Sequence, residues 1–133
     1  MNAKFFVPFE TAKLLKEKGY PQLESEYHYN INGDMVRFSD DYEGYTEDII
    51  MRITQDFYAA PIYLEVLDWL IENKIAVITV EMCEIMWNIY PIDEAGMSWY
   101  CYVRLNDTIL RTDDFDTRWD AINAAILKAL ETI

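Results

Sequence analysis

Glycine and proline constrain this chain more than any other sequence feature, because the four glycines and four prolines all lie at the boundaries of periodic segments. Gly19 and Pro21 follow a helical pattern, as a C-terminal glycine and a helix-stopping proline do. Gly33 belongs to an Asn-Gly pair, the strongest short signal for a β-hairpin. Pro61 suits the first turn of a second helix. These residues therefore separate the chain into well-defined helices and strands.

Three segments have the spacing of amphipathic helices: residues 9–18, residues 61–73 and the stretch that follows Thr117. The last of them opens with Thr117 three residues before Asp120, the arrangement of a capping box. Alanines recur on the apolar stripe of this helix, and such small side chains let a helix pack closely on a sheet. The spacing therefore predicts three helices that cover a sheet.

A hairpin is predicted at the Asn-Gly pair, with strands over residues 26–31 and 35–38. On its first strand Tyr27 and Tyr29 alternate with polar residues that include His28. This alternation indicates one buried and one solvated face, and it places His28 on the solvated face.

Four further strands and one strand boundary are indicated. Residues 75–82 are rich in β-branched side chains and predict an interior strand. A change in the parity of the apolar residues predicts a bulge or strand break near residues 83–84. Residues 97–106 alternate cleanly and predict another strand, with an edge strand at residues 108–111. Residues 49–53 fit either a short strand or a helical turn and are interpreted as a strand.

The order of these elements shows no regular strand–helix–strand alternation. It predicts a single α+β domain over residues 1–133, with two layers formed by a mainly antiparallel sheet and about three helices packed on it. A chain of 133 residues is long enough to bury one core of its own.

The charge balance limits the partners. The chain has 24 Asp and Glu against 11 Lys and Arg, a net charge of −13, which repels nucleic acid and anionic lipid. No apolar stretch is long enough for a secretory signal or a membrane span. The sequence therefore predicts a cytoplasmic protein without direct nucleic-acid or membrane binding, in which Cys83 and Cys101 stay reduced and buried.

A family resemblance is carried by FETAKLLKEKGY at residues 9–20, AAPIYLEVLDWLIEN at residues 59–73 and AINAAILKALETI at residues 121–133. Together these segments resemble a family of small proteins from phages and mobile elements of gut bacteria. In that family an Ala-Pro opening leads into a helix ending in Trp-Leu, and the chain closes with an alanine-spaced helix. The family has no assigned activity, so the resemblance implies architecture and supplies no catalytic residues.

Motifs for catalysis are missing from the sequence. His28 is the only histidine, which excludes metal motifs that need two, and there is no G-x-S-x-G, P-loop or G-x-G-x-x-G pattern. The acidic runs at residues 40–43 and 113–116 do not match a calcium loop and are interpreted as solvated loops. We therefore predict no catalytic, cofactor-binding or metal site.

Tyrosine is the more suggestive residue, with ten in the chain. A tyrosine side chain combines apolar area with a polar tip, which suits recognition surfaces. Part of this tyrosine is expected simply to cover the sheet edge and the rim of the core. The candidate interaction surface consists of Tyr27, Tyr29, Tyr42, Tyr45, Tyr100 and Tyr102.

Three functional hypotheses follow. The leading one is a non-enzymatic binding protein that acts through protein–protein contact, with another protein or with a second copy in a homodimer. The first alternative is an acidic inhibitor of a host protein that imitates a nucleic-acid backbone, since nine acids and two arginines lie between Glu24 and Asp56. The second alternative is a small ligand-binding or enzymatic domain that uses Tyr and carboxylates in a pocket.

Overall fold

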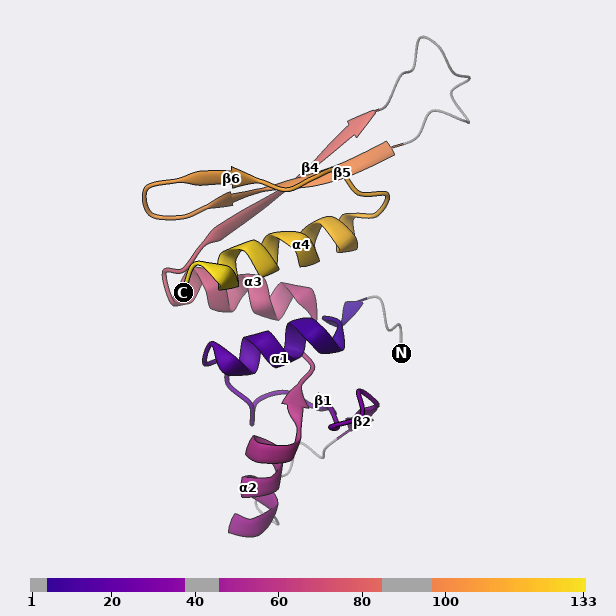
Figure 1. Ribbon diagram of the computed structural model, residues 1–133, viewed down its shortest axis with the longest axis vertical. Helices are drawn as coiled ribbons and strands as arrows, with labels where there is room; N and C mark the ends of the chain where they lie inside the picture. The colour runs from indigo at the N-terminus through magenta and orange to yellow at the C-terminus, as the bar shows by residue number, and fades with distance from the viewer. Residues whose placement is uncertain (1–4, 38–45, 85–96) are drawn as a thin grey trace. The chain divides into compact units, whose positions relative to one another are not determined.

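A computed structural model describes residues 5–37, 46–84 and 97–133 (Figure 1). Within these residues the chain forms four helices and two antiparallel three-stranded sheets. The predicted α+β class is therefore confirmed, although the sequence predicted about three helices on one sheet. The chain divides into two compact units, residues 1–65 and 66–133, which are described in turn. The single domain over residues 1–133 stays a prediction.

The first unit combines two helices with a small sheet whose strand order is β2-β1-β3. Its elements are α1 (Phe9–Glu17), β1 (Tyr27–Tyr29), β2 (Met35–Arg37), α2 (Glu47–Asp56) and β3 (Tyr58–Ala59). Helix α1 ends as predicted at Gly19, which has a φ of 97°. The amide of Tyr20 donates to the carbonyl of Leu15, and that of Gly19 donates to Lys16. This pair of bonds is the Schellman motif that a left-handed glycine permits.

The predicted hairpin is confirmed, with Gly33 at a φ of 86° between β1 and β2. The predicted exposure of His28 was wrong, because its side chain is 0% exposed. His28 lies on the central strand of its sheet, opposite Ala59 of β3, and its Nε2 lies 2.5 Å from the carbonyl oxygen of Gln22. The His28 ring is therefore enclosed on the face that sequence alternation alone presented as solvated.

Residues 49–53 were predicted to be a strand, and this was wrong, because they lie inside helix α2. A strand would place Met51 and Ile53 on one face, yet Ile53 is 1% exposed and Met51 is 52% exposed. Glu47 and Asp48 occupy the first turn of the helix, where carboxylates interact favourably with the helix dipole. The helical spacing of the apolar residues therefore determines the structure of this segment, although its β-branched residues favour a strand.

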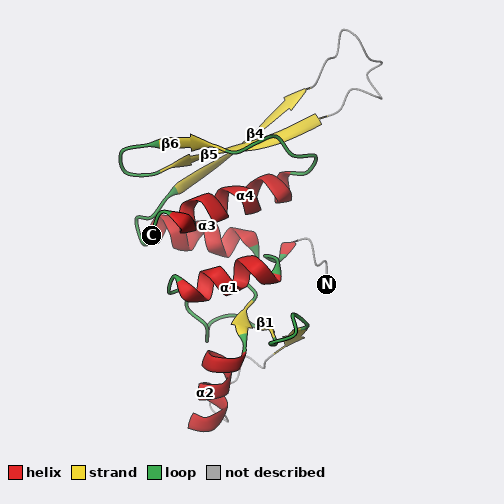
Figure 2. Cartoon of the chain, in the orientation of Figure 1, coloured by secondary structure: helices red, strands yellow, loops and turns green. Residues whose placement is uncertain are grey.

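The second unit contains most of α3 and a sheet whose strand order is β4-β5-β6 (Figure 2). Its elements are α3 (Tyr63–Glu72), which begins before the boundary, β4 (Val77–Glu84), β5 (Met97–Arg104), β6 (Ile109–Arg111) and α4 (Arg118–Glu131). Both strand pairs are antiparallel. The predicted helix at residues 61–73 and the predicted strands at residues 97–106 and 108–111 are confirmed.

Helix α4 packs against β5 and β4 and covers one face of this sheet (Figure 1). Its N-terminus is capped as predicted, because the amide of Asp120 donates to Oγ1 of Thr117 at 3.1 Å. The alanine stripe is fully buried, and Cys101 and Val103 on β5 are buried as well. Small side chains on the helix thus permit the close approach that leaves the central strand without exposure on this side.

The prediction of an interior strand at residues 75–82 was wrong within the described residues, where β4 pairs only with β5 and lies at the sheet edge. The β4–β5 ladder also runs unbroken to the pair of Glu84 and Met97, so no bulge interrupts it at residues 83–84. The residues after Glu84 whose parity suggested a break lie outside the described residues.

Candidate interaction surface

The side of the sheet turned away from α4 carries two tyrosine and two arginine side chains. We call it the outer sheet face. Strand β5 supplies Tyr100, Tyr102 and Arg104, because these residues alternate with the buried Cys101 and Val103. The outer sheet face consists of Val77, Thr79, Glu81, Tyr100, Tyr102, Arg104, Ile109 and Arg111.

The centre of the outer sheet face is a cluster of two tyrosines and an arginine. The rings of Tyr100 and Tyr102 meet edge to face, with 5.5 Å between their centroids. The guanidinium carbon of Arg111 lies 3.9 Å from the centroid of the Tyr100 ring, which is a close cation–π contact. Arg111 also donates to a carboxylate oxygen of Asp114 at 2.9 Å. These contacts hold three large side chains in place on an exposed strand surface.

The same contacts set the electrostatics of this cluster. Desolvation, the neighbouring Tyr102 and Glu81 raise the pKa of Tyr100, and the cation of Arg111 opposes them. Desolvation lowers the pKa of Arg111, but the hydrogen bond and charge of Asp114, together with Tyr100 and Tyr102, outweigh it and raise that pKa. Both groups therefore keep their protons at neutral pH, so the cluster presents hydroxyl donors and a permanent cation.

Apolar side chains border the cluster on both sides. Val77 of β4 is 45% exposed, Tyr102 is 39% exposed and Ile109 of β6 is 59% exposed. Between them lies a shallow hollow of about 280 Å³, lined by Thr79, Glu81, Tyr102, Arg104 and Ile109.

The six tyrosines predicted as an interaction surface do not lie together. Tyr100 and Tyr102 meet on the outer sheet face, whereas Tyr27 and Tyr29 belong to β1 in the first unit. There the Tyr29 hydroxyl donates to the carbonyl of Val7 at 2.5 Å, and the Tyr27 ring packs on Phe6. Tyr27 and Tyr29 are therefore half-buried packing residues in the first unit.

The remaining two candidates, Tyr42 and Tyr45, lie outside the described residues. Sequence reasoning missed the contributions of Val77, Ile109 and Arg111 to the surface. The alternation at residues 108–111 could have supplied Ile109 and Arg111, because an antiparallel edge strand places alternate residues on the face of its neighbour.

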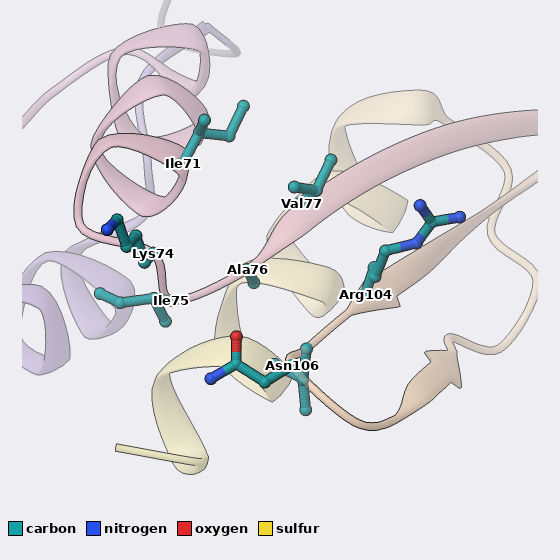
Figure 3. Close-up of a pocket in the computed structure, with 8 residues that line it drawn as sticks. Ile71, Lys74, Ile75, Ala76, Val77, Arg104 and Asn106 are labelled. Atoms are coloured by element: carbon teal, nitrogen blue, oxygen red, sulfur yellow. The ribbon is translucent and has the colours of Figure 1, made fainter.

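A second hollow of about 400 Å³ lies at the end of the same sheet (Figure 3). Ile71 and Lys74 reach it from the end of α3, and Val77 and Arg104 reach it from the sheet. The amide group of Asn106 points into the space between them. The residues that line it are Ile71, Lys74, Ile75, Ala76, Val77, Arg104, Leu105 and Asn106.

The thiol of Cys101 is inert by position. Its side chain is 0% exposed, and burial raises the pKa of the thiol to about 11. The backbone amide of Cys101 donates to Oγ1 of the buried Thr112 at 2.8 Å, which ties β5 to the chain after β6. The predicted burial is confirmed for Cys101, whereas the side chain of Cys83 lies outside the described ones.

Because the thiolate is the reactive form, native Cys101 is expected to react at least about 100-fold more slowly with Ellman's reagent at pH 8 than the unfolded chain does. The measurement uses a Cys83→Ser variant, so that Cys101 is the only thiol. Reaction of one thiol per native chain at the unfolded rate would contradict the buried position.

Within the described residues no group of three or more His, Cys, Asp and Glu side chains is placed to hold a metal ion. The acidic run at residues 113–116 is exposed and one of its members, Asp114, pairs with Arg111. The run at residues 40–43 lies outside the described residues. No helix among the described residues is long and apolar enough to cross a membrane.

The chain was compared with protein-family models, with curated proteins and with solved structures. None of the three comparisons gives a match. The geometry of the outer sheet face and of the two hollows is therefore the basis for the functional argument.

Proposed function

We propose that this protein is a non-enzymatic binding protein that acts through protein–protein contact at the outer sheet face. The observation that carries the proposal is the cluster of Tyr100, Tyr102 and Arg111 on a sheet surface that α4 leaves uncovered. Tyrosine and arginine are enriched among the residues that dominate the energy of protein interfaces. The described residues supply such anchors and no assembled metal site.

The cluster is already ordered before any partner arrives. Arg111 is held between the Tyr100 ring and the Asp114 carboxylate, and Tyr102 abuts Tyr100. Side chains that are fixed in advance lose less conformational entropy on binding, which is about 0.5–1.5 kcal/mol for each long side chain that would otherwise be immobilised. The arrangement thus favours recognition over mere coverage of the sheet.

The size of the outer sheet face limits its occupant. From Tyr100 to Arg104 it extends roughly 13 Å along β5 and roughly 10 Å across the three strands. A standard protein interface buries about 800 Å² on each partner, which is several times this area. An extended segment of a partner protein fits the face, and the affinity is expected to be micromolar or weaker.

Charge selects the chemistry of that segment. Arg104 and Arg111 lie with Glu81 on the outer sheet face of a chain whose net charge is −13. Because Arg111 already pairs with Asp114, we assign the partner's negative charge to Arg104. Guanidinium groups bind carboxylates in a bidentate geometry, and the exposed Val77 and Ile109 favour apolar side chains. We therefore propose a partner segment that carries a carboxylate beside an apolar or aromatic residue.

A buried free thiol such as Cys101 is compatible with a reducing compartment. This supports the further proposal that the protein acts in the cytoplasm.

The test is a selection of random twelve-residue peptides displayed on phage against the full chain, followed by binding measurements with synthetic copies of the enriched peptides. Peptides that combine an acidic with an apolar residue are expected to be enriched. A Tyr102→Ala, Arg104→Ser double variant should bind them at least about tenfold more weakly, which corresponds to about 1.4 kcal/mol. The matched control is Leu64→Ala with Arg52→Ser, an exposed apolar and an exposed arginine residue outside the second unit.

Other outcomes argue against the proposal. Equal binding of the peptides to the double variant, or no enrichment of acidic and apolar peptides, would overturn it. Enrichment of basic peptides whose binding falls steeply with salt would favour the acidic inhibitor instead. Light scattering that shows a dimer dissociated by the double variant would assign the face to a second copy of the chain.

A further inference from the structure

The hollow of about 400 Å³ at the end of the second sheet has a charge that contrasts with the rest of the chain. Eight described residues line it, and they include the cations Lys74 and Arg104 and none of the chain's 24 acidic residues. Asn106 adds a side-chain amide that can donate hydrogen bonds. In a chain with more than twice as many acidic as basic residues, this hollow favours an anion.

The other lining residues are apolar. Ile71 and Val77 are 51% and 45% exposed, and Figure 3 shows them facing one another across the mouth of the hollow. Ile75 and Leu105 are half-buried at its sides and Ala76 is buried. A ligand that fills this space therefore needs an apolar group as well as a negative charge.

Lys74 has a backbone conformation that is unusual for a lysine. Its φ is 57°, and it is the one non-glycine residue with a positive φ among the described residues. The amide of Lys74 donates to Ile71 and that of Ile75 donates to Leu70, so Lys74 occupies the left-handed position of a Schellman motif. Glycine is the residue that adopts this position without steric strain.

At the equivalent position in the first unit the residue is a glycine, Gly19, which ends α1 with the same pair of hydrogen bonds. Lys74 therefore carries a conformational cost that Gly19 avoids. Interaction with the C-terminal end of the helix dipole offsets part of this cost. Strained residues that a fold retains are concentrated at binding sites, and this one lies on the rim of the hollow.

Lys74 and Arg104 line the hollow from different elements, and Figure 3 shows their charged ends directed away from one another. Lys74 follows α3 and Arg104 ends β5. Both side chains are exposed, and exposed side chains change rotamer in picoseconds to nanoseconds. Each can turn towards an anion that is held between them, with the Asn106 amide as a third donor.

We infer that this hollow binds a small carboxylic acid with an apolar chain. The carboxylate pairs with Lys74 and Arg104, and the apolar chain lies against Ile71 and Val77. The site differs from the pocket of tyrosines and carboxylates expected from the sequence. It shares Val77 and Arg104 with the outer sheet face, whereas Ile71 and Lys74 lie outside that face. Variants at Lys74 therefore test this inference separately from the proposed function.

A neighbouring hollow of about 430 Å³ shares part of this lining. It includes Lys74 and Asn106, and it is also lined by Asp107 and Ile133. Asp107 lines this neighbouring hollow, and Glu81 lines the hollow of about 280 Å³ that shares Arg104. Both acids therefore belong to neighbouring hollows, and neither lines the proposed site.

The test is titration of the full chain, labelled with nitrogen-15, with hexanoate and N-acetyl-leucine, followed by amide chemical shifts. Both acids are expected to shift the amides of Ile71, Val77 and Asn106 with dissociation constants of about 1 mM or tighter. N-acetyl-leucinamide, which lacks the negative charge, is the neutral control. Stronger binding of hexanoate identifies a free acid as the source of the carboxylate, and stronger binding of N-acetyl-leucine identifies a peptide C-terminus.

Variants at Lys74 separate strain from binding. Lys74→Asn, which tolerates the left-handed conformation, should weaken acid binding at least about fivefold, and Lys74→Arg should restore it. Lys74→Gly should raise the melting temperature by about 3 °C while it also weakens binding. Lys13→Asn, outside the hollow, should leave binding unchanged. Equal binding of the amide and the acid, or acid binding that survives in Lys74→Asn, would overturn the inference.

Discussion

Replacement of Ile126 by alanine is expected to lower the free energy of unfolding by about 2–5 kcal/mol. Ile126 is 0% exposed on α4, the helix that packs against β5 and β4. Truncation removes buried apolar area and leaves a cavity that close-packed neighbours fill only in part. Urea unfolding measures the effect as a shift of the midpoint.

The matched control is Ile109→Ala on the opposite side of the same sheet. Ile109 is 59% exposed, so its truncation should change stability by about 0.5 kcal/mol or less. An equal loss in both variants would show that α4 does not cover the sheet in the way described. Because Ile109 belongs to the outer sheet face, the control also provides a stable variant with a reduced binding surface.

Acidification is expected to destabilise the protein through His28. Burial lowers the pKa of His28, and the charge of Lys16 lowers it further, while the hydrogen bond with the Gln22 carbonyl opposes both. In the unfolded chain the His28 ring has a pKa near 6.5 and takes up a proton below that pH. In the folded chain the ring stays neutral to a lower pH. The stability contributed by neutral His28 is present above about pH 6.5 and is lost as the pH falls through the depressed folded-state value.

Through His28 the free energy of unfolding is expected to fall by at most about 1.4 kcal/mol for each pH unit below 6.5, since one proton is involved. Urea unfolding at pH 7.5, 6.5, 5.5 and 5.0 of the wild type and of His28→Gln measures it. Carboxylates titrate in both proteins, so the difference between their slopes isolates the histidine. Parallel slopes would refute the role of His28, whatever the absolute stability of the variant.

Much of the fold could be predicted because local signals determined it. Gly19 and Gly33 occupy left-handed positions that other residues avoid, and Thr117 caps α4 through its own side chain. The burial of the alanine stripe followed from its spacing alone. Each of these features depends on residues a few positions apart, which is the range over which a sequence pattern is informative.

The predictions that failed depended on neighbours distant in sequence. His28 is buried, and its ring meets the carbonyl of Gln22, whose side chain accepts from the amide of Ala59 about thirty residues later than His28. The position of β4 at a sheet edge is set by which strands pair with it, and no pattern within residues 75–82 encodes that. Residues 49–53 form a helix because the face with Ile53 is buried, which overrides their β-branched composition.

The candidate site also contains residues that local patterns predicted and residues that they did not. Alternation on β5 predicted that Tyr100 and Tyr102 share a face, and the structure confirms it. The contribution of Arg111 required the register of β6. Lys74 gave no signal in the sequence, since a lysine at the end of a helix is ordinary and only its backbone conformation distinguishes it.

Among the described residues β4 offers eight residues of strand with a partner on one side only. Its other side presents backbone amides and carbonyls to any chain that can add to it. Mutual repulsion between copies at a net charge of −13 keeps such edges apart at neutral pH. As a solution approaches the isoelectric point near 4.3, that repulsion fades, and the β4 edges of neighbouring molecules can pair with one another.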